Sequence, residues 1–265
     1  MHALAPTCRV PQPAGRRSRV TVAGVLGELL LTAGAIVALF VVWQLWVGDI
    51  IIGAQHNAKG AELSQQWAEA PAPEPPPLAT TEDGSTQYTM PVLDHPADGE
   101  IFANMLVPRF GADYSVNIAG GTSRERTLDR IGIGLYTQSK MPGEIGNLSL
   151  AGHRTTWGRP FNMLDKLRLD DAIVVETQDG WYTYRFRTLE YVKPTAIDVL
   201  ADVPRMPEEQ TGERFITLTA CSPLHSLAER IVAYGVFEGF QPRAEGPPAS
   251  LAAVDAATPS ASGGL

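Results

Sequence analysis

Three side chains that lie far apart in the sequence have the types needed for acyl transfer by a thiol: Cys221, His153 and Arg230. A cysteine thiolate can attack a carbonyl carbon, and a histidine can give a proton to the amine that leaves. A guanidinium offers a planar set of donors to the carbonyl oxygen as it becomes negative, which the point charge of a lysine does less well. Together they predict a nucleophile, a general acid and base, and a clamp for the oxyanion or the substrate.

Each of these residues also has a simpler interpretation when it is considered alone. A lone cysteine is more often an inert buried residue, a histidine at a strand end a surface group, and an arginine a solvated charge. An unpaired thiol outside the cell is open to oxidation, so its retention beside an arginine favours chemistry. On these residues alone, catalysis and an inert thiol both stay open.

Metal binding is not expected. His225 lies four residues after Cys221, but two ligands without a further cluster rarely make a zinc site. Asp170-Asp171 and Glu208-Glu209 are acidic pairs of the kind that is usually solvated in turns. We predict neither a metal nor an organic cofactor.

Two strands have to position the thiol and the guanidinium. In Phe215-Ile-Thr-Leu-Thr-Ala-Cys221, strand alternation puts Thr219 on the face of Cys221 and Ala220 on the other. The next strand begins directly after Arg230, so antiparallel pairing would bring Cys221 and Arg230 to one rim. His153 closes the apolar segment LSLAG and opens a polar loop, which is typical of a rim residue.

The surrounding chain favours a mainly β fold, as a barrel or a sandwich. Short segments rich in β-branched and aromatic residues recur between residues 98 and 241, separated by Gly, Pro, Asn and Asp. Asp179-Gly180 predicts a hairpin with a two-residue turn. Residues 122–131 and 161–169 alone suggest short helices.

The N-terminal part indicates a single membrane span. Residues 29–47 carry no charge, and a helix of that length rises about 28 Å, close to the thickness of a bilayer core. Arginines at 16, 17 and 19 precede the segment, which predicts a cytoplasmic N-terminus and an extracellular remainder. Cys8 would then lie across the membrane from Cys221, which excludes a disulfide; a cleaved signal peptide is the competing interpretation.

These observations divide the chain into a cytoplasmic N-terminus (1–22), an anchor helix (23–47), a linker (48–97), a catalytic domain (98–241) and a tail (242–265). Prolines and few apolar residues predict an extended spacer for the linker and a disordered tail. The net charge of -8 disfavours nucleic-acid binding.

The stretch TLTACSPLHSLAERIVAYG resembles the sortase signature T-L-x-T-C with an arginine further on, and LAGHRTTWGRPF resembles the segment around the sortase histidine. With the preceding MPGEIGN, it looks most like the class E sortases of high-GC Gram-positive bacteria. The resemblance implies a closed eight-stranded β-barrel, with Cys221 as nucleophile, His153 as general acid and base, and Arg230 as stabiliser of the substrate carbonyl and oxyanion.

The resemblance also implies the reaction. Sortases cleave an LPxTG-like signal after Thr through a thioacyl intermediate and pass the acyl group to a cell-wall amine, and class E members prefer LAxTG. Thr219, Ala220 and Trp157 are candidate substrate-binding residues. Ala220 stands where class E members commonly have Thr, and Leu135 where many have His. A hydrolytic cysteine peptidase and a non-catalytic peptide-binding surface receptor remain as alternatives.

Overall fold

The computed structural model describes residues 21–43, 47–80, 84, 86–91 and 93–252. The chain divides into two compact units, Met1–Leu45 and Trp46–Leu265. The first contains helix α1, Val22–Val42, which is long and apolar enough to cross a membrane. Cys8 and the three arginines that precede the predicted span lie outside the described residues.

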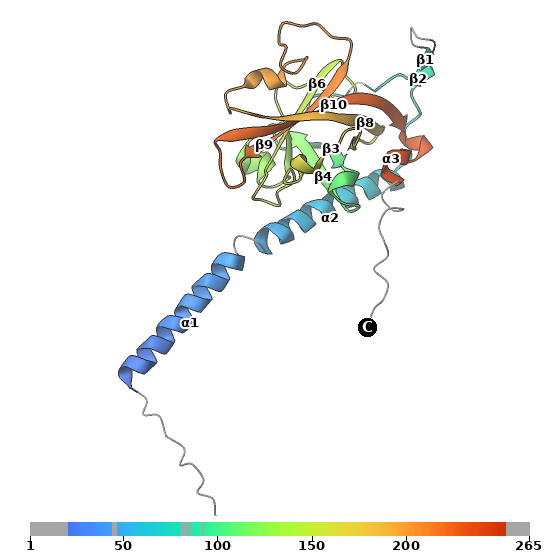
Figure 1. The fold of residues 1–265 in the computed structure, drawn as a ribbon. Helices are drawn as coiled ribbons and strands as arrows, with labels where there is room; N and C mark the ends of the chain where they lie inside the picture. Colours follow the sequence, from blue (N-terminus) through green and yellow to red (C-terminus); the bar gives the residue numbers. More distant parts are fainter. Residues whose placement is uncertain (1–20, 44–46, 81–83, 85, 92, 253–265) are drawn as a thin grey trace, which may run out of the picture. The chain divides into compact units, whose positions relative to one another are not determined.

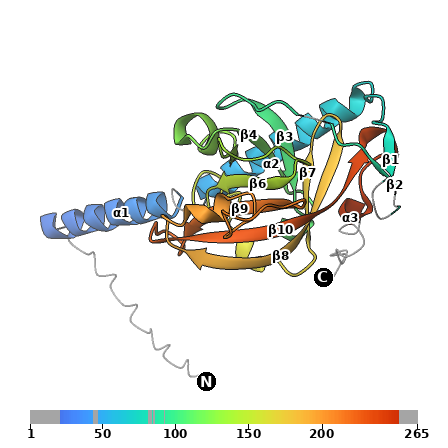
Figure 2. The same ribbon diagram turned by 90° about the horizontal axis from the view of Figure 1, so that it is seen from above.

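The second unit is built around a closed β-barrel (Figures 1 and 2). Its eight strands follow the order β10-β8-β7-β3-β4-β5-β6-β9 around the barrel, which confirms the predicted fold class. The strands are β3 (Ile101–Leu106), β4 (Ser115–Gly120), β5 (Ile133–Leu135), β6 (Gly146–Gly152), β7 (Ala172–Glu176), β8 (Gly180–Val192), β9 (Arg214–Ser222) and β10 (Glu229–Pro242).

Alternating side chains fill the inside of the barrel. On β9, Ile216, Leu218 and Ala220 join one buried apolar cluster, as strand alternation predicts. Burying an Ile or Leu side chain fully stabilises the fold by roughly 1.5–3 kcal/mol. This burial fixes which side chains of β9 point into the barrel. It therefore also fixes the direction of Cys221, which follows Ala220.

Apart from one long helix, described below, the remaining elements of the second unit are short. A two-stranded ribbon, β1 (Leu78–Thr80) and β2 (Thr86–Tyr88), lies outside the barrel. Short helices lie between strands: η2 (Pro108–Phe110), η3 (Arg124–Leu128), η4 (Leu164–Lys166) and η5 (Ile197–Leu200). Two more follow the last strand, η6 (Arg243–Glu245) and α3 (Ala249–Ala252). Elements η3 and η4 fall within the two segments for which short helices are predicted.

The predicted hairpin joins β7 and β8. Glu176 pairs with Trp181, and the Thr177 amide donates to the Gly180 carbonyl at 2.9 Å. The reversal therefore lies at Gln178 and Asp179, one residue earlier than predicted. Gly180 has a φ of 154° and already belongs to β8.

The expectation of an extended spacer directly after the anchor is wrong for residues 48–69. These form helix α2, Gly48–Glu69, which packs against β3 and β4 (Figure 1). The helix approaches the sheet closely at Gly60, where an added Cβ would overlap the carbonyl of Ser115. The prolines that deny helix lie beyond its end, from Pro71 onward.

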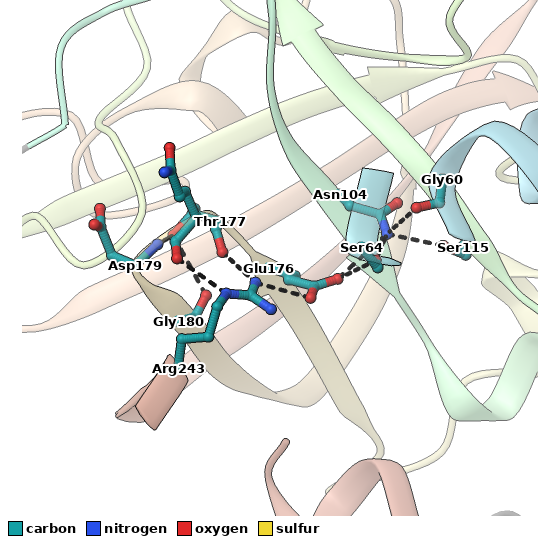
Figure 3. A network of polar contacts seen from close by, with 10 residues as sticks. Gly60, Ser64, Asn104, Ser115, Glu176, Thr177, Asp179, Gly180 and Arg243 are labelled. Carbon is teal, nitrogen blue, oxygen red and sulfur yellow. Dashed lines mark hydrogen bonds and ion pairs between the residues drawn. The ribbon is translucent and has the colours of Figure 1, made fainter. Parts of the chain in front are cut away.

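A buried polar network fixes α2 to the barrel (Figure 3). Asn104 Nδ2 on β3 donates to Ser64 Oγ at 2.9 Å and to Ser115 Oγ at 2.8 Å. Ser64 in turn donates to Glu176. Because these buried groups are hydrogen-bonded to one another away from water, they hold α2 in one position on the barrel.

The same network reaches the C-terminal segment, part of which was expected to be disordered. Arg243 Nη2 lies 2.9 Å from Glu176 Oε1, and both side chains are less than a tenth exposed. The guanidinium also stacks over the ring of Trp181, 4.6 Å from its centroid. Arg243 is thus an ordered part of the domain, whereas residues 253–265 lie outside the described residues.

Candidate active site

Cys221 and Arg230 face each other across two neighbouring strands. They are direct Cα partners in the antiparallel pairing of β9 with β10, so both stand at the same end of the barrel. Arg230 Nη1 donates to the carbonyls of Glu229 at 2.9 Å and Leu227 at 3.3 Å. Within the described part of the chain, its other two nitrogens make no hydrogen bond, so they are available to a ligand.

His153 comes to the same end of the barrel by a different route. β6 runs parallel to β9, with Ala151 opposite Thr219. His153, two residues after Ala151, therefore stands beside the end of β9 that carries Cys221. His153, Cys221 and Arg230 line one groove of about 650 Å³. The spatial meeting of the three candidate residues, on which the sequence argument depends, is present.

A carboxylate that the sequence alone does not indicate pairs with the histidine. Asp129 Oδ1 lies 2.7 Å from His153 Nε2, with side chains 16% and 15% exposed. Arg124 Nε lies 3.5 Å from the same oxygen. A carboxylate on one ring nitrogen sets the tautomer and orientation of an imidazole, which leaves Nδ1 for chemistry in the groove. Asp129 follows η3, and no spacing in the sequence relates it to His153.

A second missed contact joins the residues that follow the histidine and the cysteine. Arg154 is 7% exposed, and its Nη1 donates to Ser222 Oγ at 3.2 Å. Its Nη2 lies 3.5 Å from Asp165 Oδ1. Burial raises the pKa of Asp165, whereas the hydrogen bond and charge of Lys166 and the charge of Arg154 lower it. The lowering effects are together the larger, so the pKa of Asp165 lies below its ordinary value. Arg154 therefore braces the loop after His153 against the end of β9.

The candidate substrate-binding residues separate into two groups. Thr219 and Ala220 both line the groove, although Ala220 is 3% exposed and belongs to the inner face of the barrel. Thr219 Oγ1 lies 2.9 Å from the hydroxyl of Tyr136, a further groove residue that the sequence analysis did not single out. Trp157 is 40% exposed, has a φ of 55° and is not among the residues that line the groove.

His225 lies exposed on the loop between β9 and β10 and also lines the groove. Among the described residues, no three His, Cys, Asp or Glu side chains stand close enough together to hold a metal ion.

Known proteins are similar to this chain in both sequence and fold. The family model described as "Sortase domain" matches residues 105–238. Sortase SrtE1 of Streptomyces coelicolor is 33% identical over 258 residues, which cover 93% of this chain and 67% of that protein. Sortase SrtE2 of the same organism is 31% identical over 217 residues, which cover 80% of each.

Two solved structures extend the comparison to three dimensions. The SrtA sortase from Actinomyces oris matches with a TM-score of 0.57 and 34% identity, covering 61% of this chain and 92% of that one. Sortase E1 from Streptomyces coelicolor with a tripeptide in the active site matches with a TM-score of 0.55 and 36% identity, covering 59% and 99%. The chain belongs to the sortase family of cysteine transpeptidases and is homologous to the class E sortases of Streptomyces.

Proposed function

We propose that this sortase cleaves an LPxTG-like sorting signal of the LAxTG type after its threonine and joins the protein to an amine of a cell-wall precursor. The observation that carries the proposal is the direct pairing of Cys221 with Arg230 on a groove that His153 also lines. The tripeptide in the active site of the related sortase E1 supports a peptide as the occupant.

The first half-reaction forms a thioester. The Cys221 thiolate attacks the carbonyl carbon of the substrate threonine, and the carbonyl oxygen becomes negative. The nitrogens of Arg230 that make no hydrogen bond within the described part of the chain donate to this oxygen. His153 gives a proton to the departing glycine amine as the peptide bond breaks, which leaves a thioacyl enzyme.

The second half-reaction releases the enzyme. An incoming amine attacks the thioester carbonyl, His153 takes a proton from it, and the sulfur leaves as Cys221 is regenerated. The product contains a new amide bond between the threonine and the acceptor. The Asp129 carboxylate stabilises the positive charge of the imidazolium while His153 carries the extra proton.

The proposal places the domain outside the cell. Helix α1 would anchor the chain in the membrane by a single pass, with the N-terminus cytoplasmic because the preceding segment carries the arginines. Sortases act on proteins that carry sorting signals, and such an anchor keeps the enzyme at the surface where these proteins and a cell-wall amine meet.

A ligation assay tests the reaction. The full chain in detergent is incubated with an LAxTG peptide and an amine, and products are identified by mass. We expect a ligated product with the wild type, and loss of both cleavage and ligation with Cys221→Ala. Ligation that survives Cys221→Ala contradicts the thiol mechanism, cleavage without ligation favours the hydrolytic peptidase, and binding without cleavage favours the receptor.

A matched pair of variants tests the clamp. Arg230→Lys keeps the charge but loses the planar fork, so we expect the rate to fall by roughly 10²-fold or more. Arg187→Lys makes the same change on the exposed part of β8, where its guanidinium pairs with Asp170, and should leave the rate unchanged. Equal effects of the two variants would contradict the role of Arg230.

A further inference from the structure

His56 of α2 is buried between the two segments that carry Asp129 and His153. His56 is 5% exposed, and its imidazole lies beside the backbone of Arg130, the residue directly after Asp129. The imidazole also lies near enough to His153 for the two to influence each other electrostatically. A residue of the supposed linker thus stands behind the candidate active site.

Two glycines approach this imidazole closely. A Cβ added at Gly158 would lie 2.9 Å from His56 Nδ1, and one added at Gly132 would lie 3.2 Å from the same atom. Gly158 also abuts the backbone of Gly53, one turn earlier on α2. α2 therefore contacts the loop after β6 and the segment before β5 at the same place.

Those two contacted segments carry the two halves of the Asp129–His153 pair. The loop after His153 is closed on itself, because the Phe161 amide donates to the His153 carbonyl at 3.0 Å. Tyr114 Oη donates to the Pro160 carbonyl at 3.0 Å. The pairing of Ile133 with Gly152 joins the two segments at the ends of β5 and β6. Beyond that pairing, His56 lies between Gly132 and Gly158 of the same two segments, whose other residues Asp129 and His153 stand 2.7 Å apart.

We propose that His56 is a positioning residue for the Asp129–His153 pair, so that α2 is a part of the catalytic unit and not a spacer. The inference rests on the role proposed for His153. Burial is the largest cause that lowers the pKa of His56, and the charges of Lys59 and His153 lower it further, whereas the backbone of Arg130 raises it. A neutral imidazole at this place adds no charge that would compete with His153 for Asp129.

The test compares two substitutions of His56 in the full chain in detergent. His56→Gln keeps an N–H that can reach the Arg130 backbone, whereas His56→Phe keeps a ring of similar size without a donor. Gln55→Ala, on the exposed face of the same helix, is the matched control. With an LAxTG peptide and an amine, we expect His56→Phe to lower kcat about tenfold or more with KM within twofold.

The conservative variant separates positioning from folding. We expect His56→Gln and Gln55→Ala to keep kcat within about threefold of the wild type. Thermal unfolding followed by circular dichroism shows the folded fraction at the assay temperature, and kcat is calculated for folded protein. An unchanged kcat for folded His56→Phe, or an equal loss with His56→Gln, overturns the proposal.

A substrate-independent measurement keeps this outcome apart from that of the proposed function. In a Cys8→Ser background, the rate at which iodoacetamide alkylates Cys221 reports on the surroundings of the thiol whatever the sorting signal is. We expect His56→Phe to change this rate in the same direction as Asp129→Asn, with the Gln variant near the wild type. If His153→Ala is inactive while His56→Phe behaves as wild type in both measurements, the role of His56 fails and that of His153 stands.

Discussion

The buried pair of Arg243 and Glu176 offers a sharp test of how the ends of the domain are held. Arg243→Met keeps an apolar stem of similar length but removes the charge and its donors. Glu176 would keep only the hydrogen bonds of Ser64 and Asn104, with its own side chain 3% exposed. The variant leaves an uncompensated carboxylate inside the protein.

The expected cost follows from this burial. Removing one partner of a buried ion pair destabilises a protein by about 3–5 kcal/mol. The substitution also removes the hydrogen bonds that Arg243 donates to the carbonyls of Gln178 and Thr177, and its stacking over the ring of Trp181. For a domain of about 200 residues, 1 kcal/mol lowers Tm by roughly 2–4 °C, so we expect Tm to fall on the order of 10 °C.

The assay is thermal and urea unfolding of the second unit, with two comparison variants. Glu176→Gln combined with Arg243→Met removes both charges, and we expect it to recover at least half of the lost stability. Arg126→Met removes an arginine that lies 2.6 Å from Asp98 but is 70% exposed. Such surface pairs contribute about 0–1 kcal/mol, so the control should change Tm little.

Two results would refute this reasoning. If Arg126→Met lowers Tm as much as Arg243→Met, burial is not what makes the Glu176 pair important. If the double variant is as unstable as Arg243→Met, the loss comes from packing or hydrogen bonds of the arginine and not from a stranded carboxylate.

Three further predictions follow from the contacts around the groove and α2. Ser222→Ala removes the hydrogen-bond acceptor of the buried Arg154 and should lower kcat about tenfold in the ligation assay. A double-mutant cycle with Arg154→Met should give a coupling free energy between the two residues of about 0.5–3 kcal/mol. Gly60→Ala should destabilise the second unit by about 1–3 kcal/mol in urea unfolding, because the added methyl meets the Ser115 carbonyl, whereas Gly212→Ala, which meets nothing, should not. Burial lowers the pKa of His56 in the folded protein below its ordinary 6.5, so the unfolded chain binds the extra proton first as the pH falls. The contribution of His56 to the free energy of unfolding should therefore be complete above pH 6.5 and decrease below it by at most about 1.4 kcal/mol per pH unit. Unfolding measured over a pH series should show a smaller decrease in His56→Gln than in the wild type.

The barrel could be predicted because its strands carry a strong local signal. Period-two alternation in residues 215–221 places Ile216 and Leu218 inside, and both are fully buried. Once that orientation is fixed, the adjacent strand start at Arg230 is sufficient to place the arginine beside Cys221. His153 followed from the end of an apolar segment and from the family resemblance.

The contacts that sequence reasoning missed are those between segments that share no pattern. The neighbouring positions of β5 and β6 in the barrel bring Asp129 to His153, and the parallel pairing of β6 with β9 brings Arg154 to Ser222. Neither follows from spacing along the chain, since each depends on the order in which strands pair.

Helix α2 was missed for a different physical reason. A helix that packs through large apolar residues shows a hydrophobic stripe with a 3.6-residue period, but the buried positions of α2 are His56 and Gly60, with Ser64 and Trp67 half-buried on the same face. Its seat depends on close backbone approach and buried hydrogen bonds, which composition does not register. A soluble form that begins near residue 80 would therefore do more than omit a tether. It would uncover Asn104 and Glu176, remove the residue behind Asp129 and His153, and report the chemistry of an incomplete active site.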